Sequence, residues 1–111
     1  MDINELAIKL RTLFSDLAEI VTLESEGNWL PGLEAILDRL PPTKNAAESL
    51  ELRLQEVKSI FITMSTGQGS FADFFIWVDD FDQRVVANTE LEKLKSSIWK
   101  LLQDIPALSQ N

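Results

Sequence analysis

Apolar residues recur at intervals of three and four positions through most of the chain, which is the spacing of one face of an α-helix. The clearest stretch covers 46–64, where the apolar positions step by 3, 4, 3, 4 and 3 residues: Ala47, Leu50, Leu54, Val57, Phe61 and Met64. A seam of this kind packs against another helix. We therefore predict a helix over 46–64, with Asn45 as its N-cap and Glu48 as the capping-box partner.

The same spacing predicts two helices in the first third of the chain. Residues 3–23 carry an apolar face, and Asp2 followed by Glu5 forms a capping-box signal at their start. Residues 29–40 form a shorter amphipathic stretch with Pro31 near its beginning. Proline is tolerated in the first turn of a helix, so its position fits a helix that starts at about residue 29.

The stretch that follows the third helix is ambiguous. Four residues fit one helical face: Phe71, Phe74, Phe75 and Val78. Ser70 with Asp73 adds a capping signal, but the aromatic and β-branched run is also typical of a strand. We predict a short helix over 70–78 and an irregular acidic segment to about residue 88. The last helix should then cover 89–104 and start at Asn88 or Thr89.

Together these elements predict an all-α fold. The chain of 111 residues is 45% hydrophobic and 25% charged, which is the composition of a globular protein with a core of its own. We expect one domain over 1–111, a bundle of four to five helices with an irregular acidic segment before the last helix. The short linkers favour antiparallel packing of neighbouring helices.

The charge of the chain narrows the class of partner. Net charge is −8, from 18 acidic and 10 basic residues. Residues 1–26 carry six acids and two bases, and residues 65–89 carry four acids and one base. Binding of nucleic acid or of an anionic membrane requires lysine and arginine to neutralise phosphates, so we expect neither. A basic protein partner fits this charge distribution.

The residue types that are missing restrict the chemistry. The chain has no cysteine, no histidine and no tyrosine. It therefore lacks a thiol nucleophile, a thiolate or imidazole metal ligand and the usual general base near neutral pH. We expect a protein that is not an enzyme and needs no cofactor or metal. The lack of disulfides and the acids at positions 2 and 5, where a secretory signal would be basic, fit a cytoplasmic protein.

The most informative stretch is 71–82, which holds five large aromatic residues and four aspartates. Aromatic residues dominate the energy of protein interfaces, and acidic residues steer a basic partner to them. The simpler interpretation is a buried aromatic core with a solvated acidic rim. Trp77 makes the best case for an interface, because it lies off the predicted helical stripe. The candidate contact residues are Trp77, Asp79, Asp80, Phe81 and Asp82.

A second acidic cluster surrounds the end of the first predicted helix and contains Asp16, Glu19, Glu24 and Glu26. A solvated helix face is the ordinary explanation for such a cluster. Acids at a helix C-terminus oppose the helix dipole, however, so they cost stability where they stand. Glu24 and Glu26 are therefore a second candidate contact.

Two familiar motifs are only partly matched. Residues 67–70, Gly-Gln-Gly-Ser, resemble a phosphate-binding loop, but such a loop ends in Gly-Lys-Ser/Thr and the next lysine is Lys93. A turn is the better interpretation. Residues 79–82 resemble the start of a calcium loop. The later positions hold Arg84 and Leu91 where oxygen ligands belong, so this pattern fails.

A family resemblance rests on two linked patterns. Gly67-x-Gly69-Ser70-Phe71-x-Asp73 is followed by Asn88-x-x-Leu91-x-x-Leu94 on the last predicted helix. This stretch, about residues 60–100, resembles small bacterial proteins with a Gly-x-Gly-Ser-apolar-x-Asp motif. Some of them are immunity proteins of contact-dependent growth inhibition and related polymorphic-toxin systems. The resemblance implies a small acidic cytoplasmic protein that blocks the active site or substrate surface of a cognate toxin.

The leading hypothesis is therefore an immunity protein that neutralises a basic toxin domain, of the nuclease type. The alternative is a helical adaptor or regulatory protein that homodimerises through the seam of residues 46–64. A third interpretation is a hydrolase built on the aspartates at positions 73, 79, 80 and 82.

Overall fold

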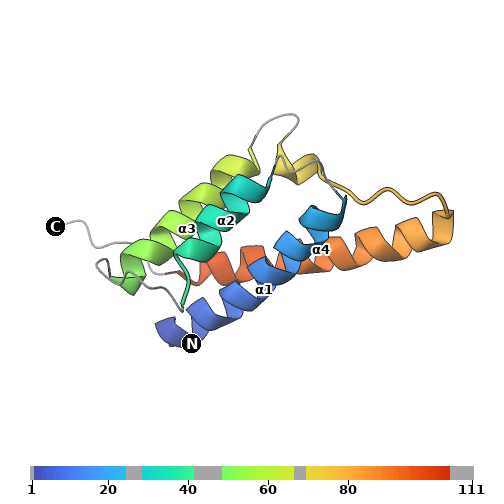
Figure 1. The fold of residues 1–111 in the computed structure, drawn as a ribbon. Helices are drawn as coiled ribbons and strands as arrows, with labels where there is room; N and C mark the ends of the chain where they lie inside the picture. The colour runs from blue at the N-terminus through green and yellow to red at the C-terminus, as the bar shows by residue number, and fades with distance from the viewer. Residues whose placement is uncertain (1, 25–28, 42–48, 67–69, 106–111) are drawn as a thin grey trace.

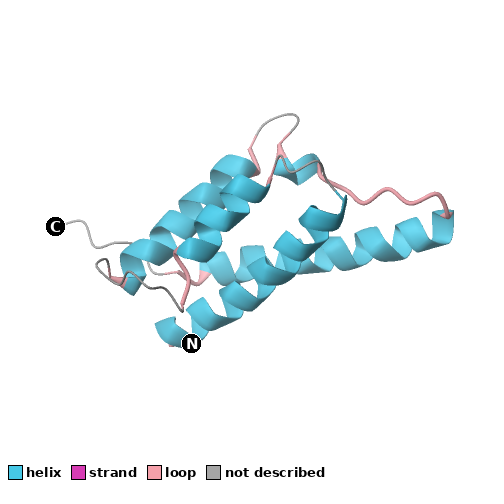
Figure 2. Ribbon diagram, in the orientation of Figure 1, coloured by secondary structure: helices cyan, strands magenta, loops and turns pink. Residues whose placement is uncertain are grey.

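The computed structural model describes residues 2–24, 29–41, 49–66 and 70–105. Within these ranges all regular elements are helical (Figures 1 and 2). They are α1 (Ile3–Glu24), α2 (Leu30–Asp38), α3 (Leu50–Met64), the short 3₁₀ helix η1 (Phe71–Asp73) and α4 (Phe81–Gln103). The predicted all-α fold is confirmed.

Successive α-helices run in alternating directions, as the short linkers predict (Figure 1). Helix α1 contacts α2, α3 and α4, and α2 also packs on α3. Because α1 touches every other α-helix, its apolar face lies at the centre of the bundle. The arrangement therefore buries the residues of α1 that the three- and four-residue spacing selects.

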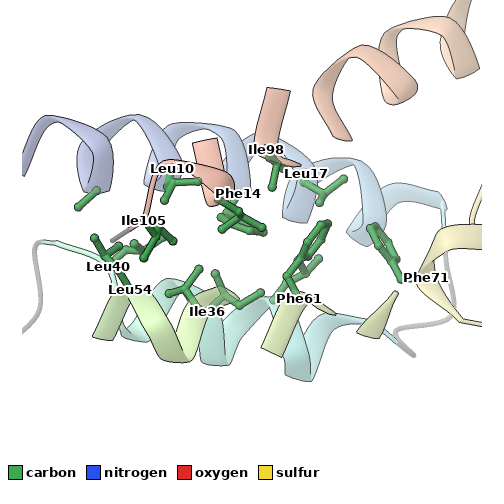
Figure 3. Packing of buried hydrophobic residues seen from close by; sticks show 14 of the residues in the cluster. Leu10, Phe14, Leu17, Ile36, Leu40, Leu54, Phe61, Phe71, Ile98 and Ile105 are labelled. Atoms are coloured by element: carbon green, nitrogen blue, oxygen red, sulfur yellow. The ribbon is translucent and has the colours of Figure 1, made fainter. Parts of the chain in front are cut away.

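Aromatic rings fill the centre of the core. Phe61 of α3 meets Phe14 of α1 edge-to-face at 5.3 Å between ring centroids, and it also lies 4.9 Å from the Trp99 ring of α4. Figure 3 shows Phe14 and Phe61 pointing toward one another between the helices. The apolar seam predicted for the third helix, Leu54, Val57 and Phe61, is buried inside this core.

Polar contacts fix how the first three helices meet. Arg11 of α1 donates hydrogen bonds to the carbonyl oxygens of Leu37 and Leu40, at 3.1 and 3.2 Å. These carbonyls lie in the last turn of α2 and just beyond it, where helix carbonyls have few intrahelical donors, and Arg11 supplies an additional donor. Arg39 forms an ion pair with Glu56 of α3 at 2.7 Å. Arg11 of α1 and Arg39, the C-cap residue of α2, thus tie the three helices together at one end.

The starts of α1 and α3 differ in how closely they agree with the predictions. Asp2 Oδ1 accepts a hydrogen bond from Asn4 N at 3.4 Å, so the predicted cap of α1 is confirmed. Helix α3 begins at Leu50 rather than at residue 46, because Ser49 is extended and its hydroxyl caps the helix by accepting from Leu52 N. Asn45 and Glu48, the predicted cap, lie outside the described residues.

The segment before the last helix is the largest correction. The predicted short helix over 70–78 is confirmed only as η1, which Ser70 caps by accepting from Ala72 N at 3.3 Å. Helix α4 begins at Phe81, two turns before the predicted start at Asn88 or Thr89. The reason is local, because Asp80 Oδ1 accepts from Gln83 N at 2.8 Å and so caps the helix. Residues 81–88 are therefore helical and not irregular.

This early start gives the molecule its shape. The principal-axis extents are 52 × 26 × 24 Å. Figure 1 shows the first turns of α4 and the loop before them reaching beyond the other helices. We call residues 74–90 the arm, and within it residues 74–80 the extended stretch. The residues that the sequence singles out for contact lie on this arm.

Candidate interaction surface

The path of the extended stretch is fixed first by Asn88 of α4. Its Oδ1 accepts a hydrogen bond from Ile76 N at 2.7 Å, and its Nδ2 donates to Ile76 O at 2.8 Å. Nδ2 also donates to the carbonyl oxygen of Arg84 at 2.9 Å. The side-chain amide thus bonds both main-chain groups of Ile76, as a residue on a neighbouring β-strand would.

Two cations of α4 hold the ends of the extended stretch. Arg84 donates from Nε to Val78 O at 2.9 Å and from Nη2 to Asp79 O at 3.3 Å. Lys95, which is buried, donates from Nζ to Phe74 O at 3.3 Å. Phe74, Ile76 and Val78 therefore turn main-chain groups toward α4. Asn88, Arg84 and Lys95 act together as a clamp on the main chain.

The clamp leaves a group of apolar side chains in solvent. Of the nine large apolar side chains exposed in the described residues, five lie on the arm: Phe75, Trp77, Phe81, Val85 and Val86. Trp77 is 60% exposed and Phe81 is 68% exposed. Trp77 and Phe81 lie beside the same Arg84 side chain, and neighbouring exposed aromatic residues mark interaction sites more often than single exposed residues do. We call these five side chains the apolar patch.

Arg84 also organises the patch. Its guanidinium carbon lies 3.6 Å from the ring centroid of Trp77 and 6.0 Å from that of Phe81. Stacking of this kind is attractive, because the π-face of an aromatic ring is electronegative. Since Arg84 also bonds two main-chain carbonyls, it links the Trp77 ring to the path of the chain. The tryptophan is thus exposed but held in one orientation.

Acidic residues stand next to the patch residues along the chain. Asp79 and Asp82 are exposed and form no ion pair within the described residues. Asp80 is exposed as well, but one of its oxygens is used to cap α4. Residues 74–90 contain four acids and one base, Arg84, which is a net charge of −3. The surface combines aromatic rings with negative charge.

The structure thus brings five of the predicted contact residues onto one projection: Trp77, Asp79, Asp80, Phe81 and Asp82. The second candidate contact is less complete. Glu24 is the last residue of α1, at the end of the bundle from which the arm extends (Figure 1). Glu26 lies outside the described residues.

Sequence reasoning missed several members of the surface. Phe75 fits the predicted helical face and is not among the predicted contact residues, yet it is 58% exposed. The cause is the extended backbone, in which neighbouring side chains point to opposite sides. Ile76 is buried and Phe75 and Trp77 are not, which is the alternation expected of an extended chain.

Val85 and Val86 are absent from the predicted contact residues because residues 81–88 are predicted to be irregular. A signal was present, since Asp80 and Gln83 stand at the spacing of a capping box. Read as a helix start, it places Val85 one turn after Phe81 on the same side of α4. The role of Asn88 had no local signal, because its partner lies 12 positions away.

The two other tryptophans, Trp29 and Trp99, pack against the core. Trp29 packs edge-to-face on Phe71 at 5.6 Å, and Trp99 lies against Phe61 at 4.9 Å. Both are partly buried against the apolar core. The contrast with Trp77 separates the structural tryptophans from the exposed one.

Nowhere in the described part of the chain do three or more acidic side chains gather closely enough to hold a metal ion. Among the described helices, none has the length and apolar character needed to cross a lipid bilayer. The aspartates at positions 73, 79, 80 and 82 therefore form no metal cluster.

Comparisons of the chain with protein-family models, with curated proteins and with solved structures find no match. The interpretation of the arm thus depends on its own geometry and charge.

Proposed function

We propose that this chain is an immunity protein, which neutralises a basic toxin domain of the nuclease type by covering its active site or substrate surface with the arm. The observation that carries the proposal is the apolar patch beside Asp79 and Asp82, on a projection whose main chain is clamped by α4. The resemblance of residues 60–100 to immunity proteins supplies the class of partner.

Preorganisation of the arm supports tight binding. Association costs free energy when loops and side chains must be ordered in the complex. Asn88, Arg84 and Lys95 already order the extended stretch, and the Arg84 stack already orients Trp77. Aromatic side chains that are exposed yet oriented are suited to be hot spots, since their burial is not offset by a large ordering cost.

The charge of the arm supports a basic target. A nuclease binds its substrate through lysine and arginine that neutralise phosphates. A surface with net charge −3 competes for the same groups, and it raises the association rate by electrostatic steering. Inhibition would therefore follow from occupancy of the substrate surface, without any chemical step on the inhibitor.

The test uses the product of the gene next to the one for this chain. The two proteins are mixed, binding is measured by calorimetry at 50 and 300 mM salt, and the toxic or nuclease activity of the partner is assayed with and without this chain. We expect a one-to-one complex that weakens at higher salt and abolishes activity, because exposed charges are screened over about 8 Å at physiological ionic strength. Absence of a complex, or a complex that leaves activity intact, would reject the proposal.

The surface that the adaptor alternative requires is buried inside the protein. This alternative requires homodimerisation through the seam of the third helix, but Leu54, Val57 and Phe61 are buried in the core of a single chain. A dimer would have to use another face, so no observation favours this function over the inhibitor.

A further inference from the structure

The main chain of the arm has one satisfied side and one open side. Ile76 turns both its N–H and its C=O toward α4, where Asn88 binds them. In an extended chain these groups alternate in direction from one residue to the next. With this alternation, the N–H and C=O groups of Phe75 and Trp77 are expected to face away from α4. Neither residue forms a backbone hydrogen bond within the described part of the chain.

This open side has the features of a β-sheet edge. Phe75 and Trp77 together present two N–H donors and two C=O acceptors, at the two-residue spacing that a neighbouring strand requires. Unpaired edges of this kind are templates for an added strand. Their rings flank the edge and offer apolar contacts to side chains of that strand.

We propose that the arm recognises its partner by strand addition: an extended segment of a basic protein pairs with the outer edge of residues 75–77. This inference rests on the proposed function and specifies its mode of contact. The bound segment should alternate apolar residues, which pack on the Phe75 and Trp77 rings, with lysine or arginine near Asp79 and Asp82. Main-chain bonds supply part of the affinity and the alternating side chains supply the choice of partner.

Charge decides between a basic segment and a second copy of this chain as the occupant. Two copies that paired edge to edge would bring together two arms of net charge −3 each. Like charges placed directly opposite on paired strands are destabilising. A segment rich in lysine and arginine instead compensates Asp79 and Asp82, which have no ion pair within the described residues.

A peptide selection tests the proposal without the toxin. Ten-residue random peptides displayed on phage are panned over the full chain, and enriched sequences are synthesised. We expect alternation of apolar residues with lysine or arginine, and competition between these peptides for one site. In one series, each peptide is N-methylated at the alternate residues whose N–H groups face residues 75–77. This removes the two N–H donors that pair with the Phe75 and Trp77 carbonyls, and it should weaken binding by about tenfold. N-methylation at the intervening residues should leave the affinity within about twofold.

Two variants at one position provide a matched pair on the protein side. Phe75→Ala and Phe75→Pro both remove the ring, but only the proline removes the outward N–H. Phe74 has φ −65° and ψ 131°, a conformation that a following proline allows. We expect the selected peptides to bind Phe75→Pro at least about threefold more weakly than Phe75→Ala, with equal melting temperatures for the two variants.

Several results would overturn strand addition. They are equal affinity for the two N-methylated series, enriched peptides without basic residues, or a panning that yields no binder. Sedimentation that shows a dimer of the wild-type chain, lost in Phe75→Pro, would assign the edge to a second copy. A different result would reject the proposed function. In that case the two N-methylated series differ as expected for strand addition, but the product of the neighbouring gene does not bind this chain. If the product of the neighbouring gene binds but the two N-methylated series have equal affinity, strand addition is rejected and the proposed inhibitor function is retained.

Discussion

Single side chains determine the path of the arm, and Asn88 is the clearest case. Its amide bonds both main-chain groups of Ile76 and the carbonyl oxygen of Arg84. A carboxamide is the side chain that can accept and donate at once in this way. Residues 74–80 contain no regular secondary structure, so their order depends on such contacts.

Asn88→Ala should therefore loosen the arm more than the rest of the fold. Loss of hydrogen bonds to partly buried main-chain groups should lower the free energy of unfolding by about 1–3 kcal/mol. Amide hydrogen exchange at Ile76, followed by NMR, should accelerate more than exchange in α1. Thr89→Ala is the control, because the Thr89 hydroxyl bonds only Val85 O in its own helix. Unchanged protection of Ile76 would show that Asn88 does not hold the arm.

Trp77→Ala should affect binding far more than stability. The ring is 60% exposed, so the free energy of unfolding should change by less than about 0.5–1 kcal/mol. Loss of a hot-spot tryptophan should weaken the complex with the toxin by about 2 kcal/mol or more, measured by calorimetry. Ile8→Ala removes a side chain that is 59% exposed, from the first half of α1. Equal losses for the two variants would place the contact elsewhere.

Some residues of this surface could be identified from the sequence. Trp77 was singled out because it lay off the predicted apolar stripe, and it is exposed. Phe75 could not be found in the same way, since its exposure follows from an extended backbone that the apolar run does not specify. Asn88 and Lys95 bind main-chain atoms of a distant segment, and main-chain atoms carry no sequence signal.

Among the helices, the start of α4 has the greatest effect on the surface. Asp80 places Phe81 in the first turn and Val85 in the next one. Without a cap, the first N–H groups of a helix have no acceptor and the turn frays. The geometry of the apolar patch is thus linked to one carboxylate.

Asp80→Ala should shorten α4 from its first turn. Loss of an N-cap should cost about 0.5–2 kcal/mol of stability, measured by urea unfolding, and should raise amide exchange at Gln83 and Arg84. Asp79→Ala is the matched control, because it removes the same charge one residue earlier, where no capping bond is made. Equal costs for the two variants would mean that charge and not capping determines the effect.

The helices that the sequence revealed are those with a buried face. The seam of α3 and the apolar face of α1 are both buried, and their positions were predicted from spacing alone. The first two turns of α4 have little core to contact, so their apolar residues are exposed and show no stripe. The capping pair Asp80 and Gln83 was the one available signal for that part of the helix.

For the whole molecule, shape and charge act together. The arm projects from a bundle whose longest extent is 52 Å, and the chain carries a net charge of −8. Charge at the tip of a projection meets a partner before the rest of the surface does. The acids of the arm should therefore control the rate of encounter more than acids elsewhere.

The double variant Asp79→Asn/Asp82→Asn should slow association with the toxin by about three- to tenfold in 50 mM salt, because steering depends on local charge. The difference should shrink in 300 mM salt, and stopped-flow fluorescence can measure both rates. Glu34→Gln/Glu51→Gln removes two exposed charges from α2 and α3 and is the control. Identical rates for both double variants would refute steering by the arm.

The clamp has one more consequence, for how new partners could be acquired. Asn88, Arg84 and Lys95 form hydrogen bonds with main-chain carbonyl and amide groups. Every residue type provides both groups except proline, which has no N–H. Side chains at positions 75, 77 and 79 can therefore be exchanged while the backbone keeps its course, except that Arg84 would lose its stacking surface at position 77. The exposed side chains of the arm can thus vary while the main chain of the arm and the helical bundle stay the same. A few substitutions on the arm would suffice to evolve, or to engineer, mutually orthogonal pairs.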